Sequence, residues 1–67
     1  MTVLHKHLIS INRAKSRADL LDVLADVIID WSQGILIVEE KDLLTDTIVK
    51  IGKYYKYKET NENEENL

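Results

Sequence analysis

The sequence predicts an all-α domain of three helices, and three observations carry that prediction. Proline is absent and glycine occurs only twice, which is unusual for sheet-rich domains because they need many turns. Apolar residues recur at spacings of three and four in three separate segments, the period of amphipathic helices. A chain of 67 residues has room for one domain at most.

The first predicted helix covers residues 3–14. Leu4, Leu8 and Ile11 recur at spacings of four and three, which places them on one face at about 100° per residue. Lys6 and Arg13 fall on the opposite side. The segment therefore predicts an amphipathic helix that buries one face.

The second predicted helix covers residues 17–32 and carries a signal at each end. Ser16 followed by Asp19 gives the pattern S-x-x-D, in which the hydroxyl accepts a hydrogen bond from a backbone N–H of the first turn. Gly34 lies just beyond the last apolar residues, and glycine readily adopts the left-handed conformation that closes a helix. Both ends of this helix are thus predicted from local signals.

The stretch ILIVEE, residues 35–40, is rich in β-branched apolar residues and has no helical period. It fits a short extended segment or strand, a connection packed on the core, or the first turn of the next helix. That third helix is predicted over residues 41–57, where Leu44, Ile48, Ile51 and Tyr55 follow a four-three-four spacing. Residues 59–67 have the composition of a disordered acidic tail.

The helix over 17–32 has more apolar surface than a small bundle can cover. Roughly two-thirds of its circumference is apolar, whereas packing on one side needs an arc of roughly 100°. We therefore expect it to be the central helix and to meet a second subunit as well. A core this small needs additional stabilisation, and the absence of cysteine excludes disulfides and thiolate metal sites as its source. This also favours a homodimer.

Four aspartates, Asp19, Asp22, Asp26 and Asp30, lie within about 80° of one another on that helix. The simplest interpretation is one solvated edge on an otherwise buried helix. Because like charges at i,i+4 repel, a role toward cations is the alternative: basic residues of the other helices, a basic partner protein, or mimicry of a nucleic-acid backbone. Trp31 lies on the apolar arc, and we expect it to be buried in the core or at an interface. These five residues are the candidates for partner binding.

The stretch KIGKYYKYK, residues 50–58, interleaves four lysines with three tyrosines, a composition typical of surfaces that bind nucleic acids. Helical spacing places Tyr55, and less closely Tyr54, beside the apolar face. The candidates for nucleic-acid contact are therefore Lys50, Lys53, Lys56, Tyr57 and Lys58. A small dimeric DNA-binding regulator is the alternative function, although the net charge of −3 opposes phosphate binding and base-reading side chains are scarce.

His5 and His7 flank Lys6 in a motif that superficially suggests a metal site. On a helix their side chains diverge by about 200°, and the sequence offers no second cluster of ligands. We therefore expect two surface histidines and no metal centre.

Composition excludes several classes of function. No apolar run reaches the roughly 18 residues that span a bilayer, and the amino terminus lacks the pattern of a secretory signal. A chain without cysteine also fits a reducing compartment. We therefore expect a cytoplasmic protein. No phosphate loop, HExxH or EF-hand pattern occurs, and we expect no enzymatic activity, cofactor or small-molecule substrate. The sequence favours a non-catalytic protein-protein interaction module, a small regulatory or accessory protein whose partners are a second copy and another protein.

Overall fold

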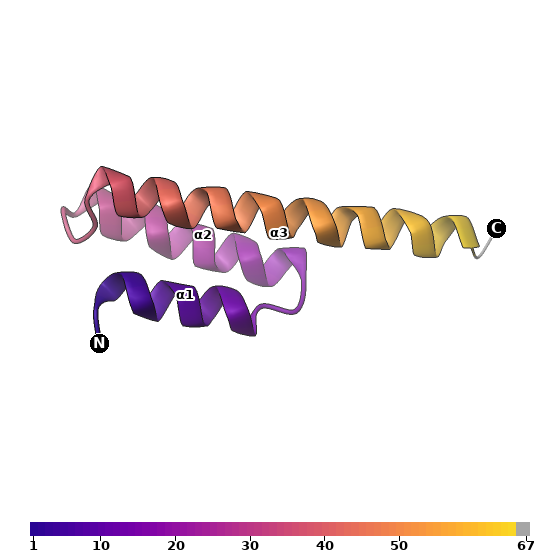
Figure 1. The fold of residues 1–67 in the computed structure, drawn as a ribbon, viewed down its shortest axis with the longest axis horizontal. Helices are drawn as coiled ribbons and strands as arrows, with labels where there is room; N and C mark the ends of the chain where they lie inside the picture. Colours follow the sequence, from indigo (N-terminus) through magenta and orange to yellow (C-terminus); the bar gives the residue numbers. More distant parts are fainter. Residues whose placement is uncertain (66–67) are drawn as a thin grey trace.

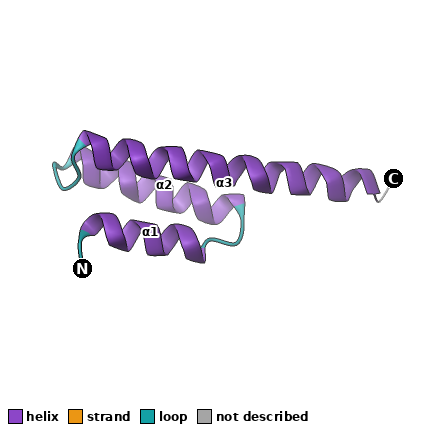
Figure 2. Ribbon diagram, viewed as in Figure 1, coloured by secondary structure: helices purple, strands orange, loops and turns teal. Residues whose placement is uncertain are grey.

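Three α-helices make up the chain (Figures 1 and 2): α1 (Val3–Arg13), α2 (Arg17–Ser32) and α3 (Val38–Glu65). The structure is a computed structural model that describes the backbone of residues 1–65 and the side chains of residues 1–58. Within residues 1–65 there is no β-strand. The prediction of an all-α domain with three helices is confirmed.

Side chains cap the first two helices at their amino ends. The Thr2 hydroxyl accepts a hydrogen bond from the His5 N–H at 3.1 Å, and the Ser16 hydroxyl accepts one from the Asp19 N–H at 3.2 Å. The Asp19 carboxylate in turn accepts from the Lys15 N–H at 2.9 Å. These bonds satisfy donors that have no partner inside the helix, which is why α2 begins where the sequence predicts.

Gly34 closes α2 in a left-handed conformation with φ of +78°. The Gly34 N–H donates to the Trp31 carbonyl at 3.0 Å, and the Ile35 N–H donates to the Asp30 carbonyl at 2.9 Å. This pair of bonds is the Schellman motif, which requires a positive φ at the glycine position. The helix therefore stops at Ser32 for a local reason.

The stretch over residues 35–40 divides between loop and helix. Residues 33–37 form the connection, and α3 begins at Val38, three residues before the predicted start at 41. The Glu40 carboxylate accepts from the Ile37 N–H at 3.2 Å, and acidic residues in a first turn interact favourably with the helix dipole. These terms outweigh the β propensity of the apolar run.

α3 also continues beyond its predicted end at residue 57, as far as Glu65. The backbone of residues 59–65 is helical, whereas the sequence predicted a disordered tail over 59–67; residues 66 and 67 lie outside the described residues. No glycine or proline follows Gly52, and extending a helix that already exists avoids the unfavourable nucleation step. Composition alone therefore placed the helix end too early.

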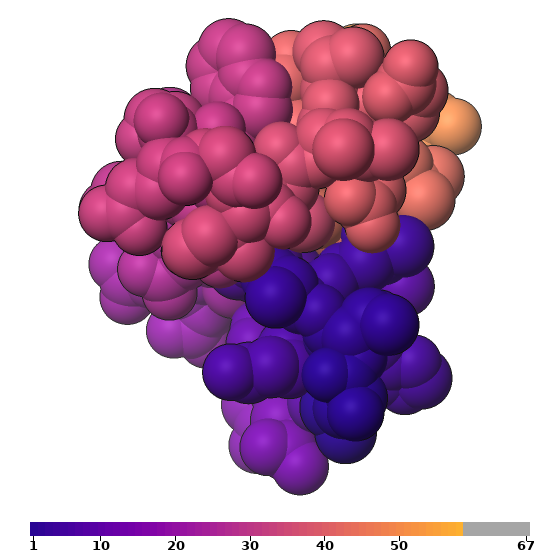
Figure 3. Space-filling view, turned by 90° about the vertical axis from the view of Figure 1, so that its left-hand side faces the viewer, coloured from indigo at the N-terminus to yellow at the C-terminus, as the bar shows by residue number. Residues whose placement is uncertain are grey.

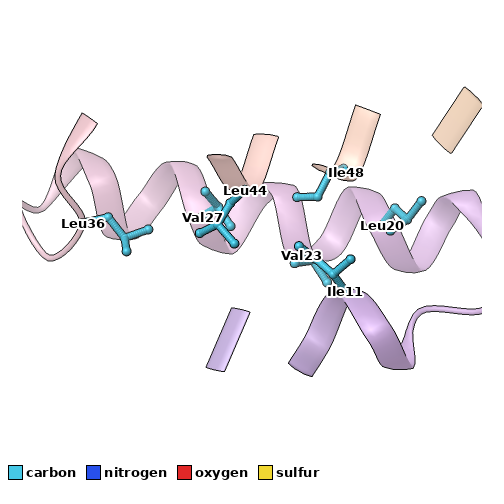
Figure 4. Close-up of a cluster of buried hydrophobic side chains, with 7 residues drawn as sticks. All are labelled: Ile11, Leu20, Val23, Val27, Leu36, Leu44 and Ile48. Atoms are coloured by element: carbon cyan, nitrogen blue, oxygen red, sulfur yellow. The ribbon is translucent and has the colours of Figure 1, made fainter. Parts of the chain in front are cut away.

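The core lies where the three helices meet, and α2 runs through its middle in Figure 4. Leu44 and Val27 are fully buried in the α2–α3 contact, and Ile11 reaches the same cluster from α1. Leu36 in the connecting loop seals one end of it. The buried apolar residues are Ile11, Leu20, Val23, Val27, Leu36, Leu44 and Ile48.

The molecule is elongated because its helices differ in length. α3 has 28 residues and α2 has 16, a difference of about 18 Å at 1.5 Å per residue. Leu20, near the start of α2, already lies beside Gly52, so the later part of α3 projects beyond the α1–α2 connection (Figure 1). The extents are 48 × 19 × 14 Å.

Candidate interaction surface

An open apolar groove runs between α2 and α3. Its floor and walls include Leu21 and Leu24 from α2 and Val49 and Gly52 from α3. Leu21 remains 64% exposed and Val49 remains 50% exposed. We call this surface, with the adjoining Ile28, the α2–α3 groove.

Helix geometry extends the groove along α2. Ile28 lies four residues after Leu24 and seven after Leu21, so the three side chains share one face. Ile28 is exposed. One turn further along, Trp31 is 41% exposed, and the Lys41 ammonium group from α3 lies 4.5 Å from the centroid of its ring.

Basic side chains border the groove. Arg17, Lys53 and Lys56 line its end near the start of α2, and Lys41 stands over Trp31 toward the other end. Arg17 and Lys56 also make contacts within the chain. An apolar floor with a basic rim suits a polypeptide that brings apolar side chains flanked by carboxylates.

The groove is open because α1 covers the other side of the α2–α3 pair. Viewed along the bundle in Figure 3, the indigo atoms of α1 lie below the magenta and salmon atoms of the α2–α3 connection and the start of α3. None of the side chains that line the groove comes from α1. The apolar arc of α2 is therefore wider than its neighbours cover, as the sequence indicates, and Leu21, Ile28, Ile29 and Trp31 stay exposed among the described side chains.

The four aspartates of α2 do not form one uniform solvated edge. Asp22 and Asp26 are exposed, and Asp19 is exposed but accepts the Lys15 N–H. Asp30 is partly buried, with its Oδ2 2.6 Å from His7 Nε2. Three of the four aspartates are exposed to solvent, as the interpretation of a solvated edge requires. That interpretation is wrong for Asp30, because α1 packs over that end of α2.

His7 is the second correction, since both histidines were expected at the surface. His5 is exposed, but His7 is only 8% exposed and points toward α2. His7 stands four residues before Ile11 and three after Leu4, so it lies on the face that packs on the core. That spacing is the sequence signal from which the burial of His7 could have been predicted. Among the described residues, no three or more His, Asp or Glu side chains lie close enough together to hold a metal ion.

Trp31 does not belong to the core of this chain. The sequence predicted burial, either in the core or at an interface, and the structure leaves the ring at the surface under Lys41. Val49 was not predicted as a site residue, because it lies outside the four-three spacing of Leu44, Ile48 and Ile51. Its place beside Leu21 depends on how α3 packs against α2.

The lysine-tyrosine cluster divides between the core and the surface. Tyr55 is partly buried and donates its hydroxyl to the Ala14 carbonyl at 3.1 Å, which ties α3 to the end of α1. Tyr54 is 61% exposed, so the expectation that it lies beside the core is wrong. The five candidates for nucleic-acid contact are all exposed: Lys50, Lys53, Lys56, Tyr57 and Lys58.

Comparison with known proteins gives no match to a protein family model, to a curated protein or to a solved structure. Among the described residues, no helix combines the length and the hydropathy that crossing a bilayer requires.

Proposed function

We propose that this protein is a non-catalytic protein-protein interaction module that acts by binding a polypeptide along the α2–α3 groove. The observation that carries the proposal is the groove itself, a strip of exposed apolar side chains at helical spacing on two adjacent helices. Contiguous apolar surface of this kind on a small protein marks an interaction site. A regulatory or accessory role in the cytoplasm belongs to the same proposal.

The size of the exposed side chains supports a polypeptide ligand. Covering a leucine, isoleucine or valine contributes about 1.5–3 kcal/mol for complete burial, and Leu21, Ile28 and Val49 are each 40% exposed or more. An amphipathic helix laid in a groove buries several such side chains together, through apolar residues at i, i+3 or i+4, and i+7. Trp31, at one end, is of the residue type that most often dominates such interfaces.

The aspartates have a smaller part in this proposal than the apolar groove. Asp19 and Asp30 already serve the helix start and the α1–α2 contact, which leaves Asp22 and Asp26 as exposed carboxylates for a basic partner. Two carboxylates one turn apart are a poor substitute for a run of phosphates. Mimicry of a nucleic acid therefore has less support than the groove.

Direct binding of DNA or RNA also has less support. Lys53 and Lys56 border the α2–α3 groove, so their position is accounted for by an apolar site with a basic rim. Lys50, Tyr57 and Lys58 are exposed, but exposure is the ordinary state of lysine on a helix surface. A nucleic-acid surface would show binding to random duplexes that weakens steeply with added salt.

The experiment compares a groove variant with a matched control on the same helix. Val49→Glu places a charge in the groove, and Leu43→Glu places one at a similarly exposed apolar position outside it. In a pull-down with tagged protein, we expect the wild type and Leu43→Glu to retain bound polypeptides, including untagged copies of this chain. Val49→Glu should lose them. Circular dichroism verifies that both variants fold. Identical binding by wild type and Val49→Glu would contradict the proposed function.

A further inference from the structure

We infer that the polypeptide in the α2–α3 groove is a second copy of this chain, related to the first by a two-fold axis beside Val49. In this dimer α3 of one copy runs antiparallel to α3 of the other, and α2 runs antiparallel to α2. The inference rests on the proposed function, because it names the partner of the same groove. Charge and apolar spacing each support it.

The charges along α3 are arranged for antiparallel self-pairing. Asp46 precedes Val49 by three residues and Lys53 follows it by four, and both side chains are exposed. When two α3 helices cross antiparallel at Val49, Asp46 of each copy falls near Lys53 of the other. A parallel arrangement would instead bring Asp46 near Asp46 and Lys53 near Lys53, which repels.

A second pair of charges repeats the pattern at twice the distance. Asp42 precedes Val49 by seven residues and Lys56 follows it by seven, so both lie two turns away on nearly the same face. The antiparallel crossing places Asp42 of one copy near Lys56 of the other. On this face of α3, Asp42 and Asp46 thus precede Val49, and Lys53 and Lys56 follow it. Within one chain Asp42 also pairs with Lys41 at 2.7 Å, and Lys56 makes a contact of its own, so Asp46 and Lys53 carry the charge argument.

The apolar residues of α2 fit the same axis. Leu20 meets Gly52, and α2 and α3 run antiparallel in the chain (Figure 1), so Leu24 lies close to the level of Ile48 and Val49, with which it lines the groove. Leu21 and Ile28 stand three residues before and four after Leu24. A two-fold axis at that level sets Leu21 of one copy against Ile28 of the other.

Charge reversal tests the register and the identity of the partner together. In sedimentation equilibrium over the micromolar range we expect the wild type to form dimers. Asp46→Lys and Lys53→Asp each replace two attractive contacts in the dimer with two repulsive ones, and each should raise the dissociation constant at least about tenfold, since exposed ion pairs contribute up to about 1 kcal/mol each. The double variant, Asp46→Lys with Lys53→Asp, restores opposite charges across the axis and should recover dimerisation.

A mixture of the two single variants gives an independent readout. Asp46→Lys has only lysines at the two positions and Lys53→Asp has only aspartates, so an equal mixture should form the mixed dimer in preference to either homodimer. Double-variant dimers weaker than those of both single variants, or a mixture with no mixed dimer, would overturn the inference. Charge effects at other surfaces would not produce this recovery.

The Val49→Glu and Leu43→Glu variants separate this inference from the proposed function. Dissociation of the dimer by Val49→Glu alone supports both. A wild-type protein that is monomeric throughout the micromolar range, yet loses other polypeptides on Val49→Glu, overturns the second copy as partner and leaves the interaction function standing. If Val49→Glu changes neither self-association nor binding of other polypeptides, both proposals are wrong.

Discussion

His7 and Asp30 join α1 to the end of α2 through a contact of 2.6 Å between Nε2 and Oδ2. The histidine is almost fully buried and the aspartate partly so. The backbone carbonyl of the same aspartate accepts the Ile35 N–H in the motif that closes α2. One residue therefore connects the shortest helix, the helix end and the loop that leads into α3.

Removing the Asp30 side chain should lower the free energy of unfolding by about 1–3 kcal/mol, because the buried His7 Nε2 loses its partner. Asp26→Ala is the control, since it changes an exposed aspartate one turn earlier in α2 and should alter stability by no more than about 0.5 kcal/mol. Urea denaturation at one protein concentration measures both variants. Equal losses would show that the contact contributes nothing to stability.

Tyr55→Phe should lower the free energy of unfolding by about 0.5–1.5 kcal/mol. The change deletes only the hydroxyl that donates to the Ala14 carbonyl and leaves the ring in place. Tyr54→Phe removes the same atom from the neighbouring, largely exposed ring and should have almost no effect. A larger loss for Tyr54→Phe than for Tyr55→Phe in urea denaturation would contradict the packing described for α3.

The two glycines should respond to alanine in opposite directions. Gly34 has a positive φ, so Gly34→Ala should destabilise the protein by about 1–2 kcal/mol. A Cβ at Gly52 would meet only Leu20 Cδ1, at 3.9 Å, so Gly52→Ala should stabilise α3 by up to about 1 kcal/mol through its helix propensity. Thermal unfolding checks the two signs. A loss of stability in Gly52→Ala would indicate that its surroundings are closer than the structure has them.

Leu44→Ala should destabilise the protein by about 2–5 kcal/mol, because it leaves a cavity between α2 and α3. Leu44 is fully buried, whereas the adjacent Leu43 is about half exposed, and Leu43→Ala should cost well under 1 kcal/mol. The pair differs by a single position in the sequence, so denaturation of the two variants tests the rotation of α3 about its axis. Comparable losses would mean that α3 packs through another face.

Local signals in the sequence predict the beginning and the end of α2. The Ser16 hydroxyl and the Gly34 backbone form their hydrogen bonds with residues a few positions away. The two ends of α2 can therefore be predicted without the tertiary structure. The end of α3 has no such signal. No side chain or glycine near residue 57 stops the helix, and composition was a poor guide to where the hydrogen bonds cease.

The side chains that form the candidate site were harder to predict than the helices. The sequence indicates that α2 has more apolar surface than two helices cover, but it does not single out Leu21 and Ile28 as the residues that stay exposed. It does not indicate that Val49 lies beside them, because the α2–α3 packing brings α3 residues into the groove. For the same reason His7 was wrongly expected at the surface, and the choice between core and interface for Trp31 could not be made from the sequence.

The sequence by itself determined that the chain folds into three helices, because apolar periodicity, the Ser16 cap and the Gly34 turn depend on interactions between near neighbours. Only the tertiary structure decided which faces of those helices meet. Burial depends on contacts between residues far apart in the chain, such as Tyr55 with Ala14 or His7 with Asp30. With α1 on one side of the α2–α3 pair, the other side keeps its groove open, and that open side is the surface on which the proposed dimer forms.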